Sequence, residues 1–111
     1  MEKFDEMLKE LNDLKIIQKS MDWSENIPED IYNEWFKGYF KTVGWGIDTV
    51  IHRWYENSTT VIEMYGRYLG IYHVSNIYSE SSEVEDIYFT MGFSEMEQIQ
   101  ITSYKEKQIN N

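Results

Sequence analysis

The apolar residues of this chain change their spacing part-way along the sequence, and this change constrains the fold more than any other feature. Over residues 2 to about 21 they recur every three or four positions, which predicts an amphipathic helix. The predicted buried stripe consists of Phe4, Met7, Leu8, Leu11, Leu14, Ile17 (or Gln18) and Met21. From about residue 59 onward, β-branched and aromatic residues alternate with polar ones, which predicts strands.

A second helix is predicted to follow a short polar stretch. Asn26 is placed to cap it, Pro28 suits its first turn because a missing N–H does no harm there, and Glu29 occupies the capping-box position. The expected buried stripe consists of Ile31, Trp35 and Tyr39, with Phe36 and Phe40 beside it. We expect Gly44 and Gly46 to end this helix.

A β-hairpin is predicted around Gly66-Arg67, which separates two apolar-rich runs and suits a type II′ turn with glycine first. In the expected register Tyr65 pairs with Tyr68, and Ile62 lies opposite Ile71. The other face of the hairpin is expected to carry Glu63, Tyr65, Tyr68 and Tyr72.

Two further strands are predicted over residues 86–93 and 95–104. Residues 47–56 fit either a helix or a strand, and we favour a strand. The predicted fold class is therefore α+β, with two N-terminal helices followed by an antiparallel sheet of four to five strands. One domain is expected over residues 1–106, with a frayed C-terminal tail over residues 107–111.

The sequence disfavours several classes of function. It contains no cysteine, which removes disulfides, zinc ribbons and thiol nucleophiles, and it has no phosphate-binding loop, G-x-S-x-G or H-E-x-x-H motif. We expect no enzymatic activity, cofactor or metal; a small hydrolase using His52 or the Glu83–Asp86 cluster is the enzymatic alternative. No apolar run has the length of a signal peptide or membrane span, so we expect a cytoplasmic protein without a membrane partner.

The net charge of -10 argues against direct nucleic-acid binding and favours a basic partner. The excess is concentrated in two segments, which we name the first and second acidic blocks. Residues 20–36 contain five acids and no base, and residues 68–104 contain six acids and no base. The first block has an ordinary explanation, because Glu29 and Asp30 lie where the start of a helix favours negative charge.

The second acidic block is the main candidate for a binding surface. Its acids are Glu80, Glu83, Glu85, Asp86, Glu95 and Glu97. Glu95 and Glu97 stand at strand spacing, where side chains on one face are roughly 6.6 Å apart, a separation comparable with that of nucleic-acid phosphates. Charges that protect a sheet edge are an alternative. A metal site is disfavoured because the segment lacks the D-x-[DN]-x-[DN]-G pattern.

Three tyrosines form a second candidate surface. On the predicted hairpin Tyr65, Tyr68 and Tyr72 share a face with an acid, and tyrosines with acidic neighbours suit an interface with a basic protein. This interpretation predicts an immunity or adaptor protein, or an oligomer that buries the face. A sheet face covered by the two helices is the equally weighted alternative.

Several short motifs lie between about residues 50 and 105. They are His52-Arg53-Trp54-Tyr55-Glu56, Ser58-Thr59-Thr60-Val61, Gly66-Arg67-Tyr68-Leu69-Gly70, Ser79-Glu80-Ser81, Glu85-Asp86 and Phe93-Ser94-Glu95-Met96-Glu97. This stretch resembles small proteins encoded by phages and mobile elements of Gram-positive bacteria. Small acidic phage proteins without enzymatic motifs are similar to anti-CRISPR inhibitors. The resemblance implies a non-enzymatic inhibitor, and a nucleic-acid mimic, that binds a basic host protein such as a CRISPR nuclease.

Overall fold

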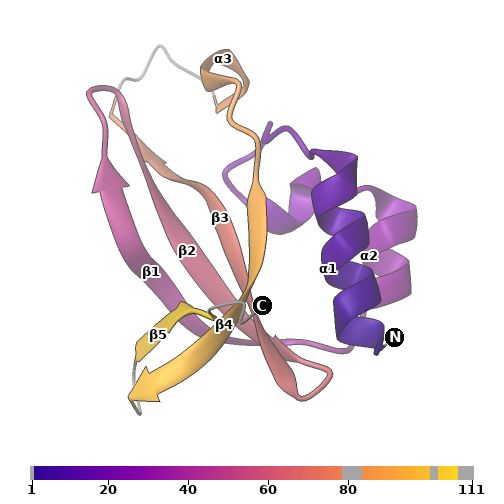
Figure 1. Cartoon of the computed structure of the whole chain (residues 1–111). Helices are drawn as coiled ribbons and strands as arrows, with labels where there is room; N and C mark the ends of the chain where they lie inside the picture. Colours follow the sequence, from indigo (N-terminus) through magenta and orange to yellow (C-terminus); the bar gives the residue numbers. More distant parts are fainter. Residues whose placement is uncertain (1, 79–83, 101–102, 108–111) are drawn as a thin grey trace.

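The computed structural model describes residues 2–78, 84–100 and 103–107, and it shows two helices followed by an antiparallel sheet (Figure 1). The side chains of residues 85, 86, 99, 100 and 103 are not described. The predicted α+β class is confirmed. The elements are α1 (Lys3–Leu14), the 3₁₀ helix η1 (Trp23–Asn26), α2 (Glu29–Trp35), β1 (Lys41–Ile51), β2 (Tyr55–Met64), β3 (Arg67–Ile77), α3 (Val84–Ile87), β4 (Gly92–Gln100) and β5 (Ser103–Glu106).

The five strands follow chain order, β1-β2-β3-β4-β5, and the sheet curls so that its edge strands β1 and β5 come into contact. α1 and α2 lie side by side against one face of the sheet (Figure 1). The main core fills the space between helices and sheet, and it consists of Phe4, Met7, Leu11, Ile16, Ile27, Ile31, Trp35, Phe36, Ile62, Met64, Leu69, Ile71, Met91 and Phe93. A smaller core of Val61, Met96 and Tyr104 lies on the other face.

α1 ends at Leu14, well before the predicted end near residue 21. Lys15 adopts a left-handed backbone with φ of 50°, which stops the helix. Beyond it, the backbone of Ile16 and Gln18 hydrogen-bonds to the segment that precedes β4. The predicted buried stripe is wrong beyond Leu11 except at Gln18: Leu14, Ile17 and Met21 are exposed, whereas Ile16 and Gln18 are buried.

α2 is shorter than predicted, because Gly38 takes a positive φ of 77° soon after its last turn. The expectation that Gly44 and Gly46 end the helix is wrong, since both lie within β1. Asn26 does not cap α2 either. Its side-chain oxygen accepts hydrogen bonds from the backbone N–H groups of Lys19 and Ser20, at 2.7 and 2.8 Å, and so holds the loop before η1.

The β2–β3 hairpin is confirmed, but its turn begins one residue earlier than predicted. Tyr65 and Gly66 both have positive φ, 51° and 73°, which is typical of a type I′ turn. Ile62 therefore lies opposite Leu69 rather than Ile71. The predicted register is wrong by two residues, and a shift of two leaves the side chains that remain in the strands on their predicted faces, while Tyr65 moves into the turn. All three aliphatic side chains are accordingly in the main core.

The other strand boundaries differ from the prediction because alternation marks a strand without marking its ends. The strand favoured at residues 47–56 is confirmed apart from a turn, since β1 ends at Ile51 and β2 begins at Tyr55. The predicted strand over 86–93 is wrong at its start, where the chain forms the end of α3. The predicted break between residues 93 and 95 is also wrong, because β4 runs without interruption from Gly92 to Gln100, and β5 follows it. Lys107, assigned to the tail, donates its backbone N–H to Glu95 at 2.9 Å. Residues 108–111 lie outside the described part.

Candidate interaction surfaces

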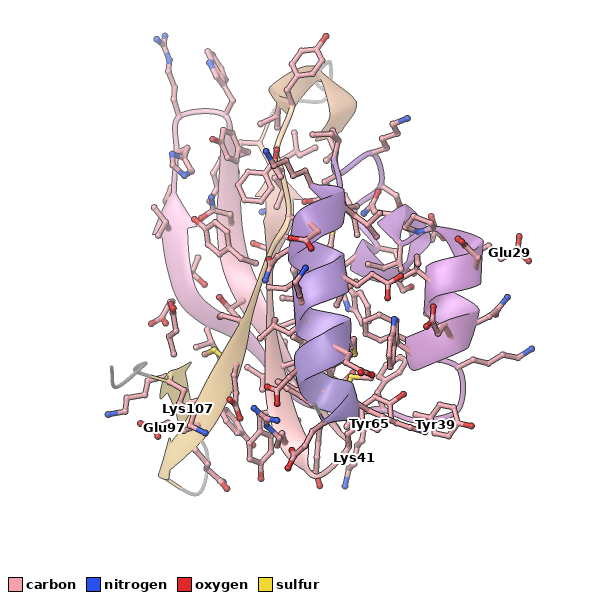
Figure 2. The ribbon with its side chains drawn as sticks, turned by 45° about the vertical axis from the view of Figure 1, so that its right-hand side comes forward. Glu29, Tyr39, Lys41, Tyr65, Glu97 and Lys107 are labelled. Atoms are coloured by element: carbon pink, nitrogen blue, oxygen red, sulfur yellow. The ribbon has the colours of Figure 1, made fainter. Side chains whose placement is uncertain are left out.

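The first acidic block lies on the helical side of the molecule. Its five carboxylates, which we name the helical acidic surface, belong to Asp22, Glu25, Glu29, Asp30 and Glu34. All five side chains are exposed, and Glu29 points away from the sheet in Figure 2. None of them forms an ion pair with a base in the described part of the chain. Asp22 and Glu25 accept hydrogen bonds from Ser24 and Ser20, but no described base neutralises the charge of the surface.

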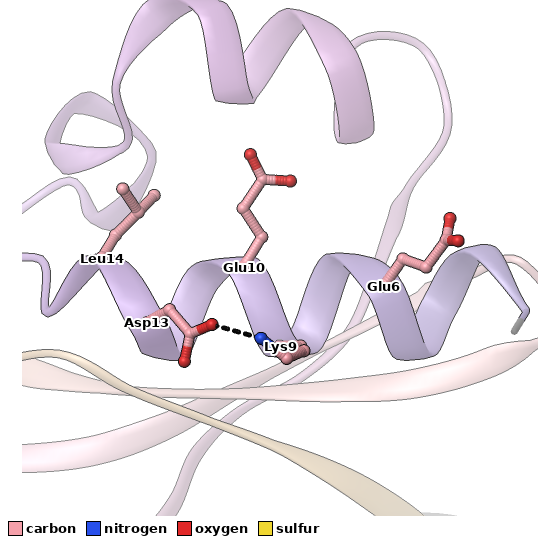
Figure 3. A pocket seen from close by; sticks show the side chains of 5 residues that line it. All are labelled: Glu6, Lys9, Glu10, Asp13 and Leu14. Carbon is pink, nitrogen blue, oxygen red and sulfur yellow. Dashed lines mark hydrogen bonds and ion pairs between the residues drawn. The ribbon is translucent and has the colours of Figure 1, made fainter.

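α1 adds further carboxylates beside this surface. The indole N–H of Trp35 on α2 donates a 2.9 Å hydrogen bond to Glu10 on α1, which fixes the two helices against each other. A shallow hollow lies along α1 at this point, and Glu10 points across it toward α2 (Figure 3). Glu6 also lines the hollow, whereas Asp13 is paired with Lys9 at 2.7 Å.

The second acidic block is only partly described. Glu80 and Glu83 lie outside the described residues, and Glu85 and Asp86 belong to α3 but their side chains are not described. The binding role predicted for these four residues stays a prediction.

Glu95 and Glu97 of the second block are compensated in the fold, so the expectation that they carry unpaired charge is wrong. Glu97 pairs with Lys105 of β5 at 3.2 Å, and Glu95 pairs with Lys107 at 3.4 Å. These bases lie just beyond the acidic segment in sequence, and β5 folds back on β4 to reach it. A count of charges within one segment cannot detect such pairs.

Arg67 forms the strongest of these contacts. Its Nε and Nη2 atoms donate hydrogen bonds of 2.8 Å to the two carboxylate oxygens of Glu95, and Nη2 donates a further 2.8 Å bond to Asp5 of α1. The guanidinium also lies 4.4 Å from the ring centroid of Phe4. These hydrogen bonds hold the pKa of both carboxyl groups below their usual values. Arg67 therefore ties α1 and β4 to the β2–β3 hairpin.

The two acidic blocks do not share a surface where both are described. In Figure 2, Glu29 lies at the outer edge of the helical layer, and Glu97 lies on the opposite side of the view beside Lys107. A partner that contacts the helical acidic surface would therefore not reach Glu97 at the same time. Among the described side chains, a single binding surface therefore does not combine Glu97 with the helical acidic surface.

The shared face predicted for the three tyrosines is wrong for Tyr65, because that residue lies in the hairpin turn. Its hydroxyl donates to the backbone oxygen of Trp35 at 2.9 Å, on the helical side of the sheet. Tyr68 packs on Tyr104 in the smaller core, with ring centroids 5.2 Å apart. Tyr72 contacts the ring of Phe89 at 5.3 Å. All three tyrosines are half-buried by residues of this chain.

His73 is a buried residue with both ring nitrogens occupied. Nδ1 lies 2.9 Å from the backbone oxygen of Val74 and must donate to it, so Nε2 accepts from the hydroxyl of Thr60 at 2.8 Å. Burial lowers the pKa of the imidazole. The other histidine, His52, stacks on Tyr55 with centroids 4.4 Å apart. In the described residues no cluster of three or more acids and histidines is arranged to hold a metal.

An exposed apolar strip on β1 was not found from the sequence. Trp45, Val50 and Ile51 of β1 and Trp54 of the following turn are exposed, and we name them the β1 apolar edge. Trp54 fits an apolar stripe in sequence and suggests a core position. The signal that identifies the edge is Gly44-Trp45-Gly46, a tryptophan between glycines in a strand with a neighbour on one side.

Comparisons with protein-family models, with curated proteins and with solved structures found no match to this chain. The resemblance to proteins of phages and mobile elements therefore stays a prediction. No helix in the described part of the chain is long and apolar enough to cross a membrane. The functional interpretation depends on the surfaces described above.

Proposed function

We propose that this chain is a non-enzymatic inhibitor that binds a basic, nucleic-acid-binding protein through the helical acidic surface. The observation that carries the proposal is that five exposed carboxylates in a single segment have no ion-pair partner among the described residues. They attract the cationic groove in which a nuclease or similar effector holds its nucleic acid. Occupying that groove would exclude the natural ligand.

The electrostatics favour steering over strong individual contacts. One exposed ion pair is worth about 0–1 kcal/mol, so no single carboxylate of this surface determines the affinity. Several like charges on one side of a small protein raise the rate of encounter with an oppositely charged partner, and this effect decreases as salt increases. We therefore expect binding that is fast and strongly dependent on ionic strength.

The environment of His73 supports a role without catalysis. His73 is buried against Thr60 and Val74, where it cannot reach a substrate. The phage setting and the CRISPR nuclease as partner are the specific form of the proposal suggested by the sequence resemblance. The general form requires only a basic protein whose groove fits the helical surface.

The proposal is tested by capture of proteins from a lysate of a Gram-positive bacterium, with mass spectrometry of what is bound. The wild-type chain should retain basic nucleic-acid-binding proteins at low salt and release them at high salt. The variant Glu29→Gln/Glu34→Gln removes two charges from opposite ends of α2 and should weaken this retention by roughly five- to tenfold.

The variant Glu63→Gln/Glu106→Gln is the matched control, because it removes the same charge from two exposed positions on the sheet. It should capture the same proteins as the wild type. Equal losses in both variants would show that net charge alone causes retention. Retention of the same proteins by all three chains at high salt would contradict the proposal.

A further inference from the structure

The β1 apolar edge exposes more aromatic and aliphatic surface than a solvated strand needs. Trp45 is 77% exposed, Ile51 71%, Trp54 54% and Val50 46%. β1 is an edge strand: it pairs with β2 on one side, and in the described part of the chain no strand is hydrogen-bonded to its other edge, although β5 contacts it beside Gly44 (Figure 1). Large apolar side chains gathered on one edge are typical of an interface or of an aggregation site.

The four side chains come from both faces of β1 and from its end. A Cβ on Gly44 would contact Ile47 and Tyr104, so Gly44 faces the smaller core, and Trp45 follows it at the register irregularity between Gly44 and Ile47. Ile51 lies opposite Glu56 in β2, while the neighbouring pair Val50 and Asn57 has the opposite orientation. The exposed apolar surface therefore follows the edge of β1 rather than one of its faces.

The charge of this region differs from that of the rest of the chain. Residues 42–54 contain one acid, Asp48, and one base, Arg53, so the segment is neutral within a protein of net charge -10. Two copies of such an acidic protein repel each other over most of their surfaces. The β1 apolar edge is a place where they can approach without bringing carboxylates together.

We infer that the β1 apolar edge is the interface of a symmetric dimer, with a second copy of this chain as its occupant. A whole aromatic side chain has an area of about 150–250 Å², and Val50 and Ile51 are somewhat smaller. Multiplied by their exposed fractions, the four side chains present roughly 500 Å² per copy. A pair would thus bury about 1,000 Å² from these side chains alone, which reaches the lower limit for a specific interface.

The irregular backbone of β1 favours a closed pair over open-ended strand addition. Its register with β2 shifts between Thr42 and Gly44, between Gly44 and Ile47, and between Ile47 and Val50. Such bulges interrupt the row of backbone groups that another strand would pair with. The contact is therefore made by side chains, and a two-fold axis through it leaves no second apolar edge exposed. Each dimer presents two helical acidic surfaces.

The proposal is tested by sedimentation equilibrium of the wild-type chain from micromolar to millimolar concentration. We expect the mass of two chains at the upper end, and a stronger association as salt increases, because salt screens the repulsion between acidic copies. This response is opposite in sign to the one expected for a basic partner, so the dimer and the proposed function can fail separately. A mass of one chain throughout, or a mass that grows beyond two chains, would overturn the inference.

The location of the interface is tested by the variant Trp45→Ser/Ile51→Thr. Because both side chains are exposed, the variant should retain the fold, and its dimer dissociation constant should rise at least about thirtyfold. The control is Tyr88→Asn, because Tyr88 is another large side chain that is 78% exposed. Its backbone has a positive φ of 53°, a conformation that asparagine tolerates. Its dimerisation should equal that of the wild type.

A second measurement needs no variant. Amide hydrogen exchange of the wild-type chain at low and high concentration should show protection that rises with concentration in residues 44–54. Unchanged exchange there, or a dimer that survives the change of Trp45 and Ile51, would overturn the assignment of the interface to β1.

Discussion

The two acidic blocks have nearly the same charge in sequence, but their carboxylates have different surroundings in the fold. The five acids of the helical acidic surface face solvent without ion pairs in the described structure, whereas Glu95 and Glu97 of the second block are paired with bases. The surroundings differ because the bases that pair with Glu95 and Glu97 lie outside the second block in sequence and contact it only in the folded sheet. Arg67 reaches Glu95 through the register of β3 with β4, in which Leu69 pairs with Glu95. Runs of acids alone therefore do not identify a binding surface.

The contrast predicts that Arg67, a base that pairs with the second block, is more important for stability than any acid of the first. Arg67→Met retains the packing of the side-chain stem but removes the guanidinium, leaving the partly buried Glu95 near Asp5 with only the more distant Lys107 to compensate it. We expect a loss of about 2–3 kcal/mol in the free energy of unfolding, measured by urea denaturation. A loss below about 0.5 kcal/mol would place Arg67 among ordinary surface residues.

The two acids of the second block are also expected to differ from each other. Glu95→Gln should cost about 1–2 kcal/mol, because it weakens two charge-assisted hydrogen bonds from a partly buried guanidinium. Glu97→Gln should change stability by no more than about 0.5 kcal/mol, since its pair with Lys105 is largely exposed. Equal effects of the two substitutions would break this distinction.

Acidification should destabilise the protein in two ranges of pH. Burial lowers the pKa of His73 in the folded state, so the unfolded state takes up its proton first as pH falls through about 6.5, and stability decreases from there. The pKa of Glu95 is lowered by its contact with Arg67, so its contribution is present above about pH 4.3 and is lost as pH falls further. Both ranges are measured by the urea midpoints at about pH 7, 5 and 3, because these three pH values lie on either side of the reference pKa values of histidine and glutamate.

Substitutions separate the two ranges. His73→Gln should flatten the change between pH 7 and 5, and Glu95→Gln should flatten the change below pH 5, since each removes the titrating group. His52→Gln is the control for the first range. If it flattened the upper range as much as His73→Gln, the assignment to the buried histidine would be wrong.

The smallest effect on stability is expected on the helical acidic surface. Glu29→Gln weakens a favourable contact with the start of α2, and Glu34→Gln relieves an unfavourable one near its end, so the double variant should change the free energy of unfolding by less than about 0.5 kcal/mol. Loss of partner capture in a variant of wild-type stability would separate binding from folding. A destabilised double variant would show that these acids have a structural role.

The predictable parts of the fold are those fixed by local chemistry. The periodicity of α1 and the glycine at residue 66 indicate a helix and a hairpin, and a register error of two residues leaves the side chains within the two strands on their correct faces. The ends of elements were not predictable. α1 stops at Lys15 with a left-handed backbone, a conformation that the sequence does not signal because lysine rarely adopts it.

The surfaces were harder to predict than the core because they depend on long-range pairing. Arg67 is 28 positions away from Glu95, so the pair forms only when β3 and β4 align. The predicted tyrosine face fails at Tyr65 because that residue occupies the turn. Trp54 resembles a core residue in sequence, and its exposure follows from its place in the turn after an edge strand.

The proposed function requires that the helical acidic surface occupies the groove in which a basic partner holds nucleic acid. It is tested most directly by fluorescence anisotropy of a labelled oligonucleotide bound to the purified captured partner. The wild-type chain should displace the oligonucleotide, Glu29→Gln/Glu34→Gln should require a several-fold higher concentration, and Glu63→Gln/Glu106→Gln should match the wild type. A complex in which the partner holds the oligonucleotide and this protein together would contradict the account.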